Sequence, residues 1–206
     1  SGAVLFFIFE YNNPESIGGK PLGTKILSSF FQSVTTRTAG FNTVPTGKLT
    51  QSTLFFMTLL MFIGASPGGT GGGIKTTTFA AVTIGALGSL RGRSQVIIFK
   101  KRLPENLFSR ALTIIFTAII LILISTIALL VFEKCTLSEA LFEVTSAFGT
   151  VGLSTGITTS LSTPSKVILI LCMYIGRIGI STLSLAIAMR SSADRAFHTE
   201  ETITIN

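Results

Sequence analysis

One long uncharged stretch, residues 111–132, constrains the fold of this chain more than any other feature. It includes six consecutive isoleucines and leucines, from Ile119 to Ile124. A helix rises about 1.5 Å per residue, so this stretch would cross the roughly 30 Å hydrocarbon core of a bilayer. The buried helix of a large soluble protein is the alternative. The length and the absence of charge favour a membrane-spanning helix.

Two further apolar segments, residues 54–90 and 167–189, extend this prediction. A glycine cluster and Lys75 interrupt the first segment, and Arg177 interrupts the second. Charged residues make up 12% of the chain, about half their usual share of about 25% in soluble domains. Both segments are internal and too long to be signal peptides. The sequence therefore predicts an all-α, multi-pass protein of the cell membrane, in contact with lipid.

The net charge of +7 is concentrated between and after the apolar segments. Six of the sixteen basic residues lie within residues 91–110, and Arg190 and Arg195 follow the last segment. This placement matches the Lys/Arg excess of cytoplasmic loops. It predicts a cytoplasmic linker and a cytoplasmic C-terminus, and it argues against a nucleic-acid partner.

Cysteine and histidine usage argues against a disulfide framework and a metal centre. Cys135 flanks a membrane segment, Cys172 lies within one, and the single His198 is in the polar tail. No cluster of residues has the spacing of a zinc or iron site, and no nucleophile–base constellation is apparent. We therefore predict that the chain is not an enzyme and binds no cofactor.

The chain contains an internal repeat whose offset places Gly40 on Gly152. Each copy runs apolar helix, short amphipathic helix, polar Thr/Gly loop, apolar helix, and such repeats indicate repeated structural units. The same offset aligns five other identities: Phe30 with Phe142, Thr38 with Thr150, Thr43 with Thr155, Thr46 with Thr158 and Leu49 with Leu161. The predicted division is residues 1–92 for the first copy, with a truncated outer helix, 93–107 for the linker, 108–190 for the second copy and 191–206 for the tail.

The orientation of the helices follows from the charges. With a cytoplasmic linker, the helix 108–132 runs outward and 167–189 runs back. The short helices, 21–36 and 137–148, and their loops then dip in from the outer face and return to it. Non-helical backbone at membrane depth is tolerated only where it is buried in protein or lines a water-filled path. We therefore predict two helix–re-entrant loop–helix repeats, half of a four-repeat pore.

The two loops have the composition of a cation filter. They read Thr38, Ala39, Gly40, Phe41 and Thr150, Val151, Gly152, Leu153. Glycine can aim its carbonyl at a pore axis, and threonine adds a further oxygen. Backbone oxygens of this kind replace the water shell of potassium without negative charge. An ordinary Thr/Gly turn is the alternative, and two loops at matching depth favour the filter.

Four motifs resemble the Trk/Ktr/HKT superfamily of potassium transporters, and KtrB-type subunits most closely. They cover residues 35–43, 64–76, 149–154 and 174–179. The resemblance implies a pore of four repeats, each with one degenerate filter strand containing a single glycine. This chain would hold the third and fourth repeats, and the remaining two would come from a longer protein or another chain. The resemblance also implies a homodimer and a cytosolic, KtrA-like nucleotide-binding regulatory subunit.

The glycine cluster predicts a broken inner helix. Six glycines in residues 64–73 cannot remain a rigid helix, because each costs about 1 kcal/mol relative to alanine. A nucleotide-binding loop needs adjacent Gly and Lys, and Ile74 intervenes between Gly73 and Lys75. In the family the resemblance points to, such a loop lies under the filter and acts as a gate; close helix packing is the alternative. The predicted gate residues are Gly68, Gly69, Thr70, Gly71, Gly72, Gly73, Lys75 and Arg177.

Arg177 is the charge whose place in the membrane most needs explanation. It would cost about 2.5–3.5 kcal/mol facing lipid, so we expect it to face a cavity or a partner. Arg177 could make a purely structural contact with the glycine-rich loop, or it could act as a latch that holds this loop as a gate. Lys75 would line the exit of the path or snorkel inward. Arg37 and Glu143 flank the two filters, and we consider an ion pair between them behind the filters.

The function predicted from these features is potassium transport, with sodium coupling left open. A secondary transporter with a substrate site at a broken helix is the alternative, although it would not need the repeated Thr-x-Gly loop. A membrane assembly module without transport is a further alternative. It would leave Arg177 and both filter glycines without a purpose.

Overall fold

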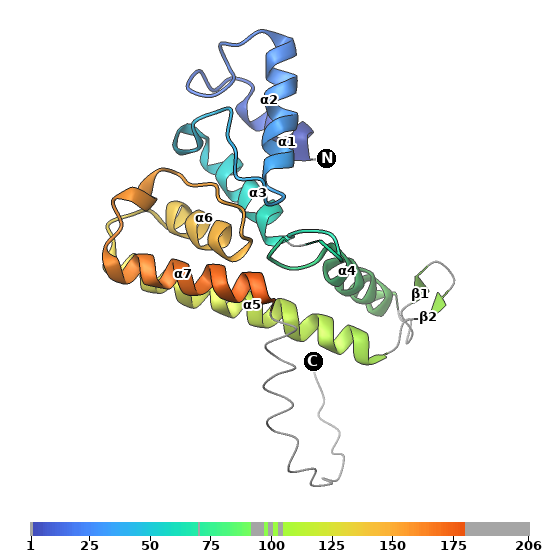
Figure 1. The fold of residues 1–206 in the computed structure, drawn as a ribbon. Helices are drawn as coiled ribbons and strands as arrows, with labels where there is room; N and C mark the ends of the chain where they lie inside the picture. The colour runs from blue at the N-terminus through green and yellow to red at the C-terminus, as the bar shows by residue number, and fades with distance from the viewer. Residues whose placement is uncertain (1, 70, 92–96, 99–100, 103–104, 180–206) are drawn as a thin grey trace.

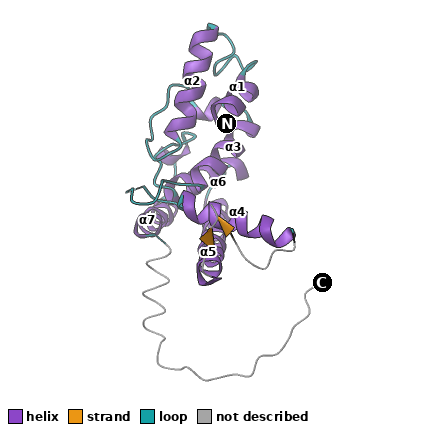
Figure 2. Ribbon diagram, turned by 90° about the vertical axis from the view of Figure 1, so that its right-hand side faces the viewer, coloured by secondary structure: helices purple, strands orange, loops and turns teal. Residues whose placement is uncertain are grey.

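Helices joined by loops make up most of the described chain (Figures 1 and 2). The computed structural model describes residues 2–69, 71–91, 97–98, 101–102 and 105–179. The elements are α1 (Gly2–Glu10), α2 (Leu22–Thr35), the 3-10 turn η1 (Thr46–Lys48), α3 (Gln51–Phe62), α4 (Thr76–Leu90), β1 (Ile97–Ile98), β2 (Lys101–Arg102), α5 (Glu105–Phe132), α6 (Leu137–Phe148), the 3-10 turn η2 (Ile157–Thr159) and α7 (Thr163–Ile178). The all-α prediction is confirmed, apart from a short two-stranded hairpin in the predicted linker.

Helix α5 is the one described helix long and apolar enough to cross a membrane. Its segment Leu107–Phe132 has a mean hydropathy of 3.1, and its 28 residues extend about 42 Å. It begins at Glu105, shortly before the predicted start at Phe108. Apolar residues on the face away from the core are exposed, as a lipid-facing surface requires: Phe116, Leu123, Ile124, Ile127 and Val131.

The glycines interrupt the inner helix of the first copy where the sequence predicts it. Helix α3 ends at Phe62 and α4 begins at Thr76. Between them the chain folds back on itself: Gly64 N donates to the carbonyl of Ile74 at 2.9 Å, and Ile74 N donates to the carbonyl of Phe62 at 3.3 Å. Gly73 adopts a φ of +74°, which glycine tolerates at no steric cost. The break is therefore an ordered loop joining two half-helices.

Helix α7 differs from the predicted span 167–189 at both ends. It begins at Thr163, with proline in its first turn, where the missing N–H is not needed. It ends at Ile178 because Gly179 takes a φ of +85°. A residue in that conformation terminates an α-helix. The rest of the expected segment and the tail 191–206 lie outside the described residues.

Each outer helix ends at a carboxylate that holds the start of the following inner helix. Glu10 Oε1 accepts hydrogen bonds from N and Oγ1 of Thr50, at 2.9 and 2.8 Å, and from Oγ1 of Thr53 at 2.5 Å. After α5, Glu133 Oε1 accepts from N and Oγ of Ser162, at 2.7 and 2.5 Å. Thr50 and Ser162 are the N-caps of α3 and α7, and the offset of the repeat pairs them. We call these two contacts the carboxylate clamps.

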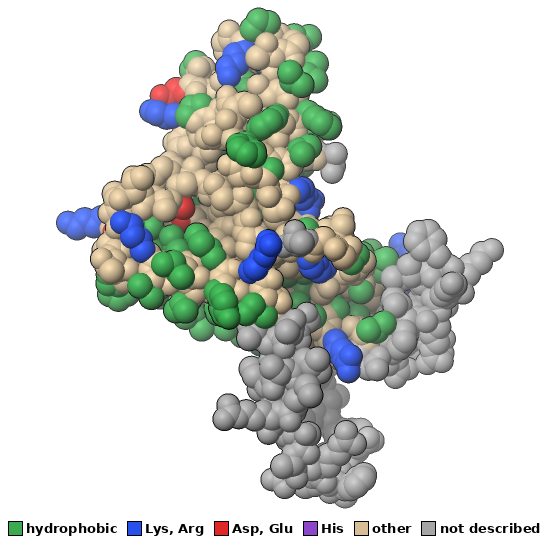
Figure 3. All heavy atoms as spheres, viewed as in Figure 1, with side chains coloured by type: hydrophobic (Ala, Val, Ile, Leu, Met, Phe, Trp, Pro, Cys, Tyr) green, Lys and Arg blue, Asp and Glu red, His purple; other side chains and the backbone are tan. Residues whose placement is uncertain are grey.

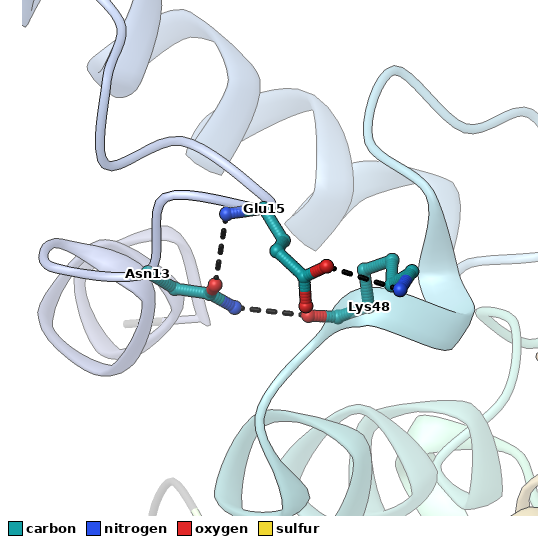
Figure 4. A network of polar contacts seen from close by, with 3 residues as sticks. All are labelled: Asn13, Glu15 and Lys48. Atoms are coloured by element: carbon teal, nitrogen blue, oxygen red, sulfur yellow. Dashed lines mark hydrogen bonds and ion pairs between the residues drawn. The ribbon is translucent and has the colours of Figure 1, made fainter.

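A surface network extends the first clamp to the turn η1 (Figure 4). Asn13 Nδ2 donates to Glu10 Oε2 at 2.6 Å and to the carbonyl of Lys48 at 2.9 Å. Lys48 Nζ forms an ion pair with Glu15 Oε1 at 3.0 Å. Both partners of that pair are more than half exposed, so it contributes about 0–1 kcal/mol. The buried clamp, and not this ion pair, therefore does most to hold α1 to α3.

The two copies meet where α3 packs against α6 (Figure 1). Met57 and Met61 of α3 share a buried core with Phe142, Val151 and Leu153 of the second copy. Helix α7 lies along α5, with α6 packed over both, and apolar side chains cover the outer face of this pair (Figure 3). The contact between α3 and α6 brings the two Thr/Gly loops into reach of each other.

Candidate functional site

The two Thr/Gly loops share an unusual backbone conformation. Among the described residues, Thr38 and Thr150 are the two other than glycine with positive φ, at +66° and +53°. Gly40 and Gly152 follow two positions later, at +74° and +88°, and the intervening residue has negative φ in both loops. A β-branched residue at positive φ is strained, so its surroundings must impose this conformation. The internal repeat therefore extends to individual backbone angles.

The loops are also in direct contact. A Cβ added to Gly40 would lie 2.6 Å from the carbonyl oxygen of Val151 and 3.4 Å from Cα of Gly152. A Cβ added to Gly152 would lie 3.5 Å from Cα of Gly40. The close approach of the two backbones thus leaves no space for a side chain at position 40, whereas position 152 has space for a Cβ.

Hydroxyl groups on the short helices α2 and α6 hold the carbonyl that follows each glycine. Ser146 Oγ donates to the carbonyl of Leu153 at 2.6 Å. Thr35 Oγ1 donates to the carbonyl of Phe41. The side chains at these equivalent positions differ in exposure: Leu153 is buried in the core between the copies, whereas Phe41 is 72% exposed.

The glycine-rich loop, residues 64–75, packs against the threonines of both Thr/Gly loops. Gly72 N donates to Thr150 Oγ1 at 2.9 Å. A Cβ added at Gly72 would lie 2.7 Å from Cγ2 of Thr150, and one at Gly71 would lie 3.0 Å from Cγ2 of Thr38. Since such distances leave no room for a side chain, the glycines allow this loop to lie against both threonines at once.

Lys75 closes the glycine-rich loop from its end. Its Nζ donates to the carbonyls of Gly69 and Gly71, at 3.0 and 2.8 Å. Within the loop, Gly68 adopts a φ of +83°. Thr70 lies outside the described residues. Lys75 is therefore a structural part of the loop.

A family model described as TrkH, cation transport protein, matches residues 2–199. The chain belongs to the TrkH family of cation transport proteins. It is 44% identical over 181 residues to Ktr system potassium uptake protein D of Bacillus subtilis, covering 88% of this chain and 40% of that protein. It is 41% identical over 187 residues to Ktr system potassium uptake protein B of Vibrio alginolyticus, covering 91% and 41%. The resemblance to KtrB-type subunits is confirmed.

The TrkH-family fold is confirmed independently. The crystal structure of the potassium transporter TrkH from Vibrio parahaemolyticus superposes with a TM-score of 0.74 at 18% identity, covering 91% of this chain and 41% of that one. The chain thus spans about two fifths of the length of the proteins it matches. Its relatives are transport proteins, in agreement with the prediction that the chain is not an enzyme.

Arg177 of this TrkH-family chain lies on a cavity of about 430 Å³ between α6 and α7. Thr150, Gly152 and Leu153 of the second Thr/Gly loop line the same cavity. Within the described residues, the structure gives Arg177 no hydrogen bond to the glycine-rich loop. Helix α7 approaches that loop through its backbone instead: a Cβ at Gly72 would lie 3.0 Å from the carbonyl oxygen of Gly176. Arg177, whose side chain is exposed, therefore lines this cavity at its α7 side.

The predicted ion pair between Arg37 and Glu143 is wrong. Arg37 follows the end of α2 and donates to the carbonyls of Ile63 and Gly64, so it supports the glycine-rich loop. Glu143 lies within α6 and faces the segment after the second Thr/Gly loop, where Ser154 Oγ donates to it at 2.5 Å. The two side chains thus point to different parts of the molecule.

Sequence reasoning also missed the acceptors that hold the chain after each loop. Glu143 Oε1 accepts from Thr155 N at 2.9 Å. In the first copy, Gln32 with its amide oxygen turned inward accepts from Thr43 N at 3.3 Å and from Val44 N at 3.2 Å. Each short helix carries several polar residues, so the sequence alone did not single out Gln32 or Glu143.

Proposed function

We propose that residues 38–41 and 150–153 form two strands of a potassium filter. The observation that carries this proposal is the matched alternation of φ in two loops that contact each other. Such a backbone can present a series of carbonyl oxygens to one dehydrated cation. Thr38 and Thr150 would add hydroxyl oxygens at the inner end. Potassium would bind to the backbone of the filter, and no resident cofactor would be required.

The names of the relatives support the transported ion. Two of them are potassium uptake proteins of Ktr systems. Another, the potassium/sodium uptake protein NtpJ of Enterococcus hirae, is 33% identical over 199 residues, covering 95% of this chain and 44% of that protein. Potassium is therefore the proposed main ion, and sodium is the candidate coupling ion to test beside it.

The glycine-rich loop is the proposed gate of this path. Its contacts with Thr38 and Thr150 support this role, because they would place it at the inner end of both filter strands. The proposed gate comprises Gly68, Gly69, Thr70, Gly71, Gly72, Gly73, Lys75 and Arg177. Such a loop would obstruct the path when packed against the threonines and clear it when displaced.

The proposed assembly needs further partners. Two strands cannot surround an ion, so the remaining two pore repeats would complete the filter. A homodimeric membrane subunit and a cytosolic, KtrA-like nucleotide-binding subunit are the further proposals. Residues 91–110 and the tail 191–206 would face that subunit from the cytoplasmic side.

Ion uptake in cells that lack their own potassium transporters tests this function. The chain is expressed within a full-length transporter, with the preceding repeats supplied. The parent should restore potassium uptake, and Gly152→Ser should change the ratio of potassium to sodium uptake at unchanged surface level. A well-expressed parent that carries no potassium would overturn the proposed function.

A further inference from the structure

Glu143 is a buried carboxylate directly beside the proposed filter. It is 4% exposed and lies in the middle of α6, between Phe142 and Val144, which are both fully buried. Its oxygens accept four hydrogen bonds: from Ser154 Oγ at 2.5 Å, Thr155 N at 2.9 Å, Thr155 Oγ1 at 3.2 Å and Thr158 Oγ1 at 2.9 Å. All four donors belong to the segment that follows the second filter strand. One side chain therefore anchors the segment that directly follows that strand.

Gln32 occupies the equivalent place in the first copy. It is 1% exposed, and with its amide oxygen turned inward it would accept hydrogen bonds from the backbone N–H groups of Thr43 and Val44. The offset of the repeat pairs Thr43 with Thr155, so the held position is the same in both copies. One copy therefore uses a neutral amide where the other uses a carboxylate.

The carboxylate differs from the amide in its charge and in the number of donors it holds. Within the described residues, the one ion pair joins Lys48 to Glu15, so hydrogen bonds alone satisfy Glu143. Arg177 lines the same cavity as Glu143, Thr150 and Gly152, without an ion pair between the two charges. A buried charge held only by neutral donors keeps most of its field, because the protein interior screens it weakly.

We propose that Glu143 is a positioning residue that sets the ion selectivity of the second filter strand. Its hydrogen bonds fix the backbone after Leu153, and its charge favours a cation at the carbonyls beside it. Gln32 fixes the first strand without adding charge, which makes the two strands electrostatically unequal. This inference rests on the proposed filter function and concerns one residue within it.

The test compares Glu143→Gln with the parent in the full-length transporter. Glutamine is the residue that the first copy uses, so the variant keeps the size and an acceptor and removes the charge. We expect the ratio of potassium to sodium uptake to fall by roughly tenfold, the size of one charge-assisted hydrogen bond. Thr158→Val removes one donor and retains the charge, so it should lower the ratio by a smaller factor. It also tests the inference if Glu143→Gln fails to fold.

Glu10→Gln is the matched control, because Glu10 is equally buried, accepts hydrogen bonds from four residues and lies in a clamp outside the filter. It should lower thermal stability and leave the uptake ratio unchanged. A ratio in Glu143→Gln and Thr158→Val equal to that of the parent would overturn the inference and leave the filter proposal intact. Failure of the parent to carry potassium would instead overturn the filter proposal itself.

Discussion

Gly72 N donates a hydrogen bond to Thr150 Oγ1 at 2.9 Å, across 78 positions of sequence. This bond joins the glycine-rich loop to the second Thr/Gly loop directly. Thr150 has positive φ, and its side chain forms the surface on which Gly72 rests. The conformation of one loop therefore depends on the position of the other, and substitutions at this contact should affect both.

Gly72→Ala should displace the glycine-rich loop. The added methyl group would lie 2.7 Å from Thr150 Cγ2, and overpacking of this kind costs about 1–3 kcal/mol. If the loop obstructs the path, potassium flux should rise at saturating potassium. Gly88→Ala is the matched control, since Gly88 lies in α4 outside the loop and an added Cβ there would meet nothing within 4 Å. Equal flux in both variants at equal surface level would remove Gly72 from the gate.

The two filter glycines should differ in their tolerance of alanine. Gly40→Ala would bring Cβ to 2.6 Å from the Val151 carbonyl oxygen, whereas Gly152→Ala meets its nearest atom at 3.5 Å. Both positions have positive φ, so each substitution costs about 1 kcal/mol or more in backbone strain. We expect Gly40→Ala to lower the thermal unfolding temperature in detergent more than Gly152→Ala. The reverse order would show that the two loops are not packed as described.

The sequence predicted those features that repeat in the chain or depend on composition. The long α5, the break at the glycines and the span of α6 all follow from runs of apolar residues and from helix propensity. The end of α7 could not be predicted from these, because Gly179 lies inside an apolar segment and its φ is set by the fold.

The network behind the loops escaped prediction because a single offset does not describe the repeat. The offset that pairs the Thr/Gly loops would place Gln32 one position beyond Glu143, on Val144. Gln32 and Glu143 face the equivalent residues Thr43 and Thr155 from places on the two helices that differ by one residue. The ion pair predicted between Arg37 and Glu143 was wrong because sequence position near a loop does not fix the direction of a side chain.

Three substitutions at Arg177 separate a latch from an electrostatic barrier. Arg177→Ala removes the charge and the hydrogen-bond donors, Arg177→Gln keeps a donor, and Arg177→Lys keeps the charge. A barrier predicts higher flux in Ala and Gln and parental flux in Lys. A latch predicts that Gln falls between Arg and Ala, and that Lys rescues only in part because it lacks the five-donor fork. Parental flux in all three, at normal surface levels, would exclude Arg177 from gating.

Glu133 should make the outer end of the second copy sensitive to acid. Hydrogen bonds from Ser162 and Ser165 hold the pKa of this carboxyl below its ordinary value of 4.5. A lowered folded-state pKa stabilises the fold above the unfolded pKa, and this contribution is lost as the pH falls through the folded value. Glu133→Gln should therefore lower the unfolding temperature at neutral pH and do so less in acid.

The measurement is the difference in unfolding temperature between parent and Glu133→Gln in detergent, at neutral pH and at about pH 3, below the ordinary carboxyl range. Glu15→Gln serves as the control, because its ion pair with Lys48 is exposed. A difference for Glu133→Gln that does not change with pH would mean that the clamp is held by shape and not by charge.

The two carboxylate clamps have a consequence for the order in which the molecule assembles. Glu10 reaches Thr50 across 40 positions and Glu133 reaches Ser162 across 29, so each clamp closes within its own copy. The contact of Gly72 with Thr150 spans 78 positions and needs both copies. Short closures form at lower entropic cost than long ones, and the N-terminal part of a chain is synthesised first. We therefore expect the helical frames to form before the loops meet, so that the contact between the copies is made last.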